Sequence, residues 1–224
     1  MRYAVHPYDF KAYDTEKIRK EFLIKRLFET DEIILVYSMY DRFIVGGAMP
    51  GDKTLKLETF SELKAENFLE RREMGIINTG GKAEISTSAG IFSLDYKEAL
   101  YLGRGTENVE FRSVIPGNPA RLYINSAPAH HEYPCRKITV KEAEIGVLGS
   151  PEQSNHRTVN KLIVNSVLKT CQLQMGMTEL KPGSVWNTMP VHTHARRMEA
   201  YFYFEVPEKE GICHFMGDPD ETRH

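Results

Sequence analysis

The pattern of apolar and polar residues changes character near residue 30. Before that point, Asp14 precedes the run "TEKIRKEFLIKRLF". The apolar residues of this run recur at helical spacing, at Ile18, Phe22, Leu23 and Leu27. An acidic residue that can cap the first turn, followed by apolar residues three to four positions apart, is typical of an amphipathic helix. We therefore predict a short helical segment within residues 1–30.

After residue 30 the chain consists of short runs rich in β-branched and aromatic residues. Glycine- and proline-containing turn signals separate these runs, among them "TGG", "SAG", "GRG" and "PGNP". The runs are "EIILVYS", "DRFIVGGA", "REMGIIN", "KAEIST", "IFSLD", "EALYLG", "NVEFRSV" and "ARLYIN". Short strands at such close spacing favour a β-sandwich or β-barrel over units in which strands and helices alternate.

A weak internal repeat indicates that the strands form two halves. "ERREMGIIN" at 70–78 resembles "ARRMEAYFY" at 195–203, an offset of 125 residues. We predict an N-terminal helical segment at 1–30, a first barrel-like half at 31–135, a polar connector at 136–162 and a second, strand-rich half at 163–224. One short helix is expected at 61–68, and the connector is expected to hold some helix near "VKEAE".

Composition excludes several classes of protein. The 224 residues are 41% hydrophobic and 27% charged, and 29 Lys and Arg face 31 Asp and Glu, for a net charge of −2. Neither a basic surface for nucleic acid nor an apolar run long enough to span a membrane is present in the sequence. The three cysteines are widely spaced, which indicates neither a disulfide framework nor a zinc ribbon. We expect a cytoplasmic protein.

The chemistry-bearing stretch is "MPVHTHARRMEAYFYFEV" at 189–206. Side chains two positions apart in an extended strand point to the same face, so His192 and His194 can be directed at one point. Glu199 follows His194 by five positions, an odd step that would place it on the opposite face. A bend or bulge near Ala195 is therefore required before the carboxylate can join the two imidazoles.

Beyond the bend, alternation divides the side chains into two faces. Glu199, Tyr201, Tyr203 and Glu205 share a polar and aromatic front, and Ala200, Phe202, Phe204 and Val206 share an apolar back. Two histidines and a carboxylate suit Zn, Fe, Mn or Ni and leave positions open for water or substrate. The alternative is a histidine pair in a sheet that binds nothing. The adjacent pair His130–His131 has no comparable partners, and we interpret it as part of a surface loop.

These residues belong to a wider resemblance. "YDRFIVGGAMP", "FLERREMGIINTGG", "EALYLGRGT", "SNHRTVNKLI", "PVHTHARRMEAYFYF" and "MGDPDETRH" together resemble the 5-keto-4-deoxyuronate isomerase family of the cupin superfamily. The resemblance covers essentially the whole chain. It implies a mainly β protein with two cupin-like double-stranded β-barrel halves, of which the first has no metal. It further implies one Zn²⁺ per subunit, the zinc ligands His192, His194 and Glu199, a hexamer, and a uronate substrate that undergoes ketol isomerisation.

Two further residues are candidates for binding the substrate. Arginine binds carboxylates through two parallel hydrogen bonds, and Arg197 is expected to face the metal side if the strand begins there. Arg196 lies beside it. Tyr201 shares the face of Glu199, so its phenol is placed to reach substrate. The general base is not identified by the sequence.

One departure from the family stands out. The family continues beyond the equivalent of "DETRH" and carries a fourth, histidine ligand there, so we expect the second barrel to be incomplete in this chain. His214 and His224 are more typical of surface or barrel-wall residues than of replacement ligands. Two other functions remain open: an Fe(II) cupin dioxygenase with the same ligands, and a non-catalytic sugar-binding cupin.

Overall fold

The computed structural model describes residues 1–195, 197–217 and 220, and these form a mainly β protein with short N-terminal helices. The helices are α1 (Pro7–Phe10) and α2 (Thr15–Phe22). Asp14 caps α2 as predicted, because its carboxylate accepts a hydrogen bond from the amide of Lys17 at 2.8 Å. The predicted fold class is thus confirmed in its mainly antiparallel β character and its short N-terminal helix.

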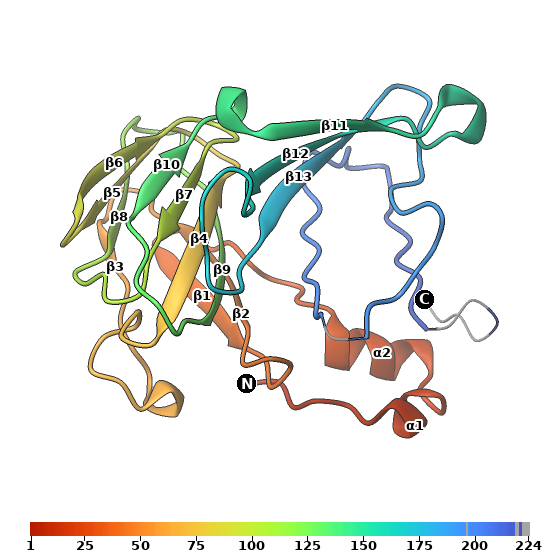
Figure 1. Ribbon diagram of the computed structural model, residues 1–224, viewed down its shortest axis with the longest axis horizontal. Helices are drawn as coiled ribbons and strands as arrows, with labels where there is room; N and C mark the ends of the chain where they lie inside the picture. The colour runs from red at the N-terminus through yellow and green to blue at the C-terminus, as the bar shows by residue number, and fades with distance from the viewer. Residues whose placement is uncertain (196, 218–219, 221–224) are drawn as a thin grey trace.

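The largest sheet of the described residues has six antiparallel strands in the order β1-β2-β9-β4-β7-β10. The strands are β1 (Glu32–Tyr37), β2 (Ile44–Met49), β9 (Leu122–Pro128), β4 (Arg72–Asn78), β7 (Ala99–Leu102) and β10 (Arg136–Ile138). A four-stranded sheet covers one face of this central sheet, in the order β3-β8-β5-β6 (Figure 1). Its strands are β3 (Leu55–Lys56), β8 (Glu110–Ser113), β5 (Ala83–Thr87) and β6 (Gly90–Leu94).

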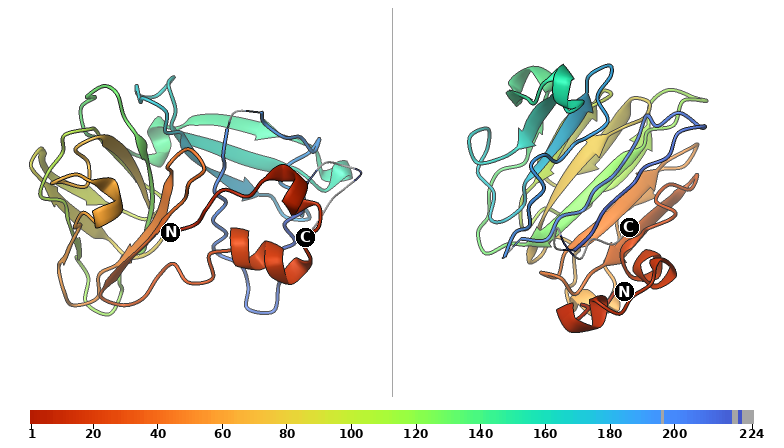
Figure 2. Two further views of the ribbon diagram at one scale, coloured as in Figure 1. Left: turned by 90° about the horizontal axis from the view of Figure 1, so that it is seen from below. Right: turned by 90° about the vertical axis from the view of Figure 1, so that its right-hand side faces the viewer.

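The other face of the central sheet is covered by a three-stranded sheet and by the C-terminal segment (Figure 2). The three strands are β11 (Glu144–Leu148), β12 (Arg157–Ile163) and β13 (Met175–Leu180). The elements β10, β11 and most of β12 fall inside the range 136–162 predicted as a connector. The domain boundaries themselves stay a prediction.

Because both of its faces are covered, the central sheet has two hydrophobic cores. Neighbouring residues of one strand point into opposite cores: Ile76 packs toward the four-stranded sheet, and Ile77 packs toward β12 and β13. Every residue of β4 is buried. This explains why "REMGIIN" shows no clear alternation of apolar and polar residues, since a strand buried on both sides has no solvent face.

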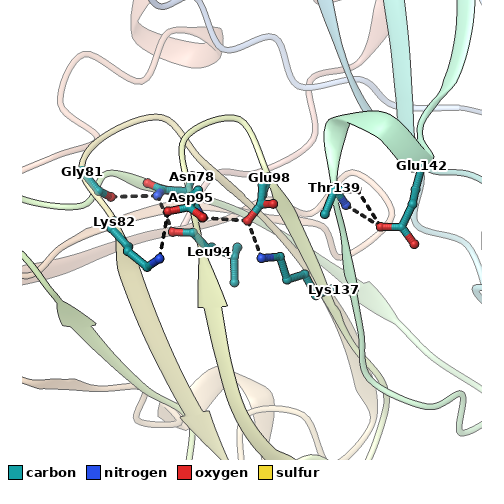
Figure 3. Close-up of polar contacts among 9 residues, drawn as sticks. All are labelled: Asn78, Gly81, Lys82, Leu94, Asp95, Glu98, Lys137, Thr139 and Glu142. Atoms are coloured by element: carbon teal, nitrogen blue, oxygen red, sulfur yellow. Dashed lines mark hydrogen bonds and ion pairs between the residues drawn. The ribbon is translucent and has the colours of Figure 1, made fainter.

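Polar contacts hold the turns at one end of the two packed sheets together (Figure 3). The buried side chain of Asn78 donates to the carbonyl oxygens of Gly81 at 2.8 Å and Leu94 at 3.2 Å. Close by, Glu98 accepts from the backbone amide of Asp95 at 2.8 Å and pairs with Lys137 at 2.6 Å. These contacts join β4 to β6, and the residue that precedes β7 to β10.

Three expectations differ from the structure. The helix expected at 61–68 is a single 3-10 turn at Ser61–Leu63, and the helix expected near "VKEAE" is a 3-10 turn at Val140–Glu142. Strands were expected to the end of the chain, but within the described residues the last one is β13, and the described residues beyond it form no further strand. Alternation of side chains shapes an extended segment locally, whereas a strand also needs a neighbour in hydrogen-bonding register.

Gly47 permits a close approach that positions the segment before β1. A Cβ atom at Gly47 would lie 2.2 Å from the carbonyl oxygen of Leu27 and 2.8 Å from Cε1 of Phe28. We expect Gly47→Ala to lower the free energy of unfolding by about 1–3 kcal/mol, the usual cost of overpacking. Urea denaturation measures this change.

The matched control is Gly146→Ala in β11, where an added Cβ would meet no atom within 4 Å. This variant should unfold at or slightly above the wild-type midpoint, since alanine suits a strand better than glycine. Equal midpoints for Gly47→Ala and the wild type would contradict the close packing of Leu27 on β2.

Candidate metal centre

The apolar back of the segment 199–206 packs on the central sheet. The ring of Phe202 stacks on Tyr123 of β9 with centroids 4.8 Å apart, and it meets Phe28 edge-on at 5.6 Å. Phe204 lies parallel to Phe202 at 5.6 Å. The phenols of Tyr201 and Tyr203 are on the exposed front. The predicted apolar back is confirmed for Ala200, Phe202 and Phe204, whereas Val206, also predicted there, is exposed.

The far end of this segment is anchored by an ion-pair cluster. Lys97, in the turn between β6 and β7, pairs with Glu179 of β13 at 2.7 Å and with Glu205 at 3.2 Å. The phenol of Tyr96 also donates a hydrogen bond to Glu205. The carboxylate of Glu205 therefore anchors the end of the segment. Together with the packing of Phe202 on the central sheet, this anchor fixes the position of the front face.

His192 and His194 lie together, as their spacing predicts. Their ring centroids are 4.9 Å apart and the rings are nearly perpendicular, at 87°. Nδ1 of His192 lies 2.9 Å from the carbonyl oxygen of Pro190. Since a carbonyl only accepts, Nδ1 carries the proton and Nε2 keeps a free lone pair, which is the arrangement typical of a metal-ligating histidine.

The backbone bends at Ala195, and Glu199 lies beside His194 after the bend. Oε1 of Glu199 lies 3.4 Å from Nε2 of His194. The bend predicted from the odd spacing is confirmed. Arg196, the neighbour of Arg197, lies outside the described residues.

The guanidinium of Arg197 lies between the two donors. Its Nη2 is 2.7 Å from Oε1 of Glu199 and 2.5 Å from Nε2 of His194. Arg197 thus lies on the side of Glu199 and His194, where it was expected, and its role in binding substrate stays a prediction. Arg197 places a positive charge where the lone pairs of His194 and Glu199 meet.

Tyr201 completes the contacts of the carboxylate. Its hydroxyl donates a hydrogen bond to Oε2 of Glu199. Burial, and after it this hydrogen bond, raises the pKa of Tyr201 to about 12. Burial alone would raise the pKa of Glu199, but the bond from Tyr201 and the charge of Arg197 outweigh it and lower that pKa. Glu199 is thus held as a carboxylate, the form that a metal requires.

With this geometry in place, comparison with known proteins identifies the family. The sequence model of the KduI/IolB family matches residues 22–223. The chain belongs to the KduI/IolB family.

Two similar proteins carry closely matching descriptions. The 4-deoxy-L-threo-5-hexosulose-uronate ketol-isomerase of Bacteroides fragilis is 59% identical over 224 residues, which are 100% of this chain and 80% of that protein. The 4-deoxy-L-threo-5-hexosulose-uronate ketol-isomerase 1 of Bacteroides thetaiotaomicron is also 59% identical, with the same coverage. A solved structure of an IolB-like protein from Salmonella typhimurium LT2 aligns with 57% of this chain and 46% of its own, at 20% identity and a TM-score of 0.42.

The side chains of His192, His194 and Glu199 are of the kinds that bind zinc, but in this structure they are not directed at one point. Zinc takes imidazole nitrogens and carboxylate oxygens at about 2 Å around one point. Among the described residues, no three His, Cys, Asp or Glu side chains are grouped closely enough to hold a metal ion. The guanidinium of Arg197 occupies the gap between His194 and Glu199, so these two donors can share a cation only after Arg197 has moved.

The structure also reveals contacts of the front face that the sequence did not indicate. His214 lies beside Tyr201 and Tyr203, with Nδ1 2.8 Å from the hydroxyl of Tyr203. His224 lies outside the described residues. Alternation places Tyr203 on the front, but no local pattern signals a contact with a histidine 11 residues away. No helix among the described residues is long and apolar enough to cross a membrane.

Proposed function

We propose that the protein is a zinc-dependent ketol-isomerase that converts 5-dehydro-4-deoxy-D-glucuronate into 3-deoxy-D-glycero-2,5-hexodiulosonate. The observation that carries this proposal is the 59% identity, over the whole chain, to proteins described as 4-deoxy-L-threo-5-hexosulose-uronate ketol-isomerases. The function belongs to uronate and pectin breakdown. By the same resemblance we propose a homo-oligomer, specifically a hexamer, in the cytoplasm.

The reaction moves a proton between neighbouring carbons through an enediolate. Zinc held by His192, His194 and Glu199 would supply positive charge that stabilises the developing oxyanion. Hydrogen bonding supports this assignment, because Pro190 fixes the tautomer of His192 and Tyr201 donates to Glu199. Both are the kind of outer contact that orients metal ligands.

Arg197 is proposed to bind the carboxylate of the uronate. Its guanidinium is about half exposed and contacts Glu199 and His194 from the front of the segment. An arginine released from that position would be free to form two parallel hydrogen bonds with a carboxylate. Tyr201 is proposed to contact the substrate from the same face.

The experiment combines product identification with metal analysis. We expect the purified protein to convert the 4-deoxy-hexosulose uronate into an isomer of unchanged mass, seen by NMR and mass spectrometry, without consuming oxygen. We expect close to one equivalent of zinc per subunit. Oxygen consumption with bound iron would instead indicate a dioxygenase, and uronate binding without turnover would indicate a sugar-binding protein.

A further inference from the structure

The isomerisation needs a group that removes and returns a proton, and the metal ligands are not free to do so. A base must approach the substrate from the same face as the metal. Among the described residues, the titratable side chains of this segment and its front contacts, apart from the ligands, are Arg197, Tyr201, Tyr203, Glu205 and His214. A base needs an atom that is free to accept a proton, so a residue whose reactive atom already has a hydrogen-bond or ion-pair partner cannot serve.

Three of these residues are excluded by their contacts or their chemistry. Arg197 is a guanidinium, which remains protonated in proteins and cannot act as a base. Glu205 accepts from Lys97 and Tyr96 at the end of the segment. Tyr201 donates its proton to Glu199. Tyr203 and His214 remain.

Tyr203 and His214 form a hydrogen-bonded pair held between aromatic rings. The hydroxyl of Tyr203 and Nδ1 of His214 are 2.8 Å apart. The rings of Tyr201 and Tyr203 are nearly parallel at 6.4 Å, and the His214 imidazole meets them edge-on at 5.1 and 6.2 Å. A contact to one nitrogen and two ring contacts fix the orientation of the imidazole, as a base that must approach a carbon atom requires.

A continuous chain of contacts connects this pair to the ligands. Glu199 accepts from the hydroxyl of Tyr201, the ring of Tyr201 touches the imidazole of His214, and His214 is bonded to Tyr203. The pair is thus linked to Glu199 through Tyr201; Tyr203 belongs to the same segment as Glu199, and His214 follows further along the chain.

We infer that His214 is the catalytic base of the isomerisation and that Tyr203 positions it; this inference rests on the proposed ketol-isomerase function. In the tautomer that this role requires, Nδ1–H of His214 donates to the Tyr203 oxygen, and the lone pair of Nε2 is left for the substrate. Nε2 takes the proton from the carbon that bears a hydroxyl beside the carbonyl, and the C–H electron pair forms the C=C bond of the enediolate. The imidazolium returns that proton to the former carbonyl carbon, while the hydroxyl proton moves to the neighbouring oxygen. No oxidant or reductant is consumed.

The electrostatics of the pair agree with these roles. Partial burial lowers the pKa of His214, so its imidazole is neutral near pH 7 and can accept a proton. Burial raises the pKa of Tyr203, which therefore keeps its phenol proton and does not compete as the base. Within the part of the chain that the structure describes, the ring contacts of His214 are with two tyrosines, and neither of them carries a charge.

The test replaces His214 by glutamine and compares it with His131→Gln. His131 is a suitable control because it is an exposed histidine whose ring also lies against a tyrosine, Tyr133, at 4.6 Å. We expect His214→Gln to lower kcat by about 10²–10⁴-fold, the usual contribution of general acid–base catalysis. Exchange of substrate hydrogen with D₂O should fall in parallel, with zinc content and melting temperature unchanged. His131→Gln should match the wild type.

Two further variants separate a chemical role from a structural one. Added imidazole should restore part of the activity of His214→Ala, and Tyr203→Phe should lose activity to a smaller extent. Full activity of His214→Gln would overturn the inference while leaving the proposed function intact, and so would a loss of zinc in step with its loss of activity. A wild-type protein that does not isomerise the uronate would refute the proposed function and the inference together.

Discussion

Glu73→Gln is expected to lower the free energy of unfolding by about 3 kcal/mol or more. The Glu73 side chain has no exposed surface, and its two oxygens accept four hydrogen bonds. Oε1 accepts from the amides of Gln172 and Leu173, both at 2.7 Å. Oε2 accepts from the amide of Cys171 at 2.8 Å and from the hydroxyl of Tyr101 at 2.7 Å.

A glutamine side chain cannot satisfy these donors. Its NH₂ group must replace one oxygen, so at least one backbone N–H faces another donor in the interior. A buried group left without a partner costs about 1–3 kcal/mol, and each hydrogen bond to a charged group contributes about 1.5–3 kcal/mol. Glu73 also joins β4 to the chain that enters β13. We therefore expect a large loss of stability, measured by urea denaturation.

Two further variants make the test specific. Glu84→Gln is the matched control, because Glu84 forms a surface pair with Arg112 at 2.7 Å and should change stability by less than about 1 kcal/mol. Tyr101→Phe removes only one of the four donors and should fall between the two. Burial and the bond to Glu73 raise the pKa of Tyr101, so its hydroxyl keeps the donated proton. Similar unfolding midpoints for Glu73→Gln and Glu84→Gln would contradict a stabilising role for the buried hydrogen bonds of Glu73.

Replacing both His192 and His194 by alanine is expected to abolish zinc binding and turnover. The two imidazoles supply two of the three proposed ligands, and Glu199 alone offers no site that competes with water for zinc. Loss of an outer residue that merely supports a ligand costs about 10–100-fold in affinity or activity, so loss of two ligands should exceed 100-fold. Metal content by mass spectrometry and turnover are the measurements.

The matched control replaces His130 and His131 by alanine. Both are exposed, and their removal changes the same number of histidines away from the segment 189–206. This variant should keep wild-type zinc content and turnover. If the His192 and His194 variant kept both its zinc and its activity, the metal would have to be held elsewhere and the proposed function would lose its chemical basis.

Local patterns predicted more of the candidate site than of its surroundings. The shared side of His192 and His194, the bend before Glu199 and the apolar back at Phe202 all follow from the two-residue period of extended chain. The contacts of Arg197 with Glu199 and His194 also join residues that are close together in the sequence, so local patterns can indicate them. The pairing of Tyr203 with His214 could not be predicted from the sequence. Periodicity relates residues within one extended segment, and these two residues lie in different segments.

For the fold, the sequence predicted the early strands closely and the later ones poorly. Runs such as "REMGIIN" and "KAEIST" coincide with β4 and β5, because turn residues mark their ends. The segment beyond β13 has equally strand-like residues and no ladder within the described part of the chain. A strand depends on a neighbour as well as on its own residues, and the neighbour is a property of the whole chain.

The sequence by itself determined the character of this protein: a mainly β chain with an N-terminal helix and a His-x-His segment whose side chains sort into two faces. Backbone geometry dictates these features over a few residues, so they can be read locally. Only the tertiary structure decided that the central sheet is buried on both faces and that Glu73 receives amides about 100 residues away. Such contacts form because the folded chain removes apolar surface from water and must then pair every polar group it buries.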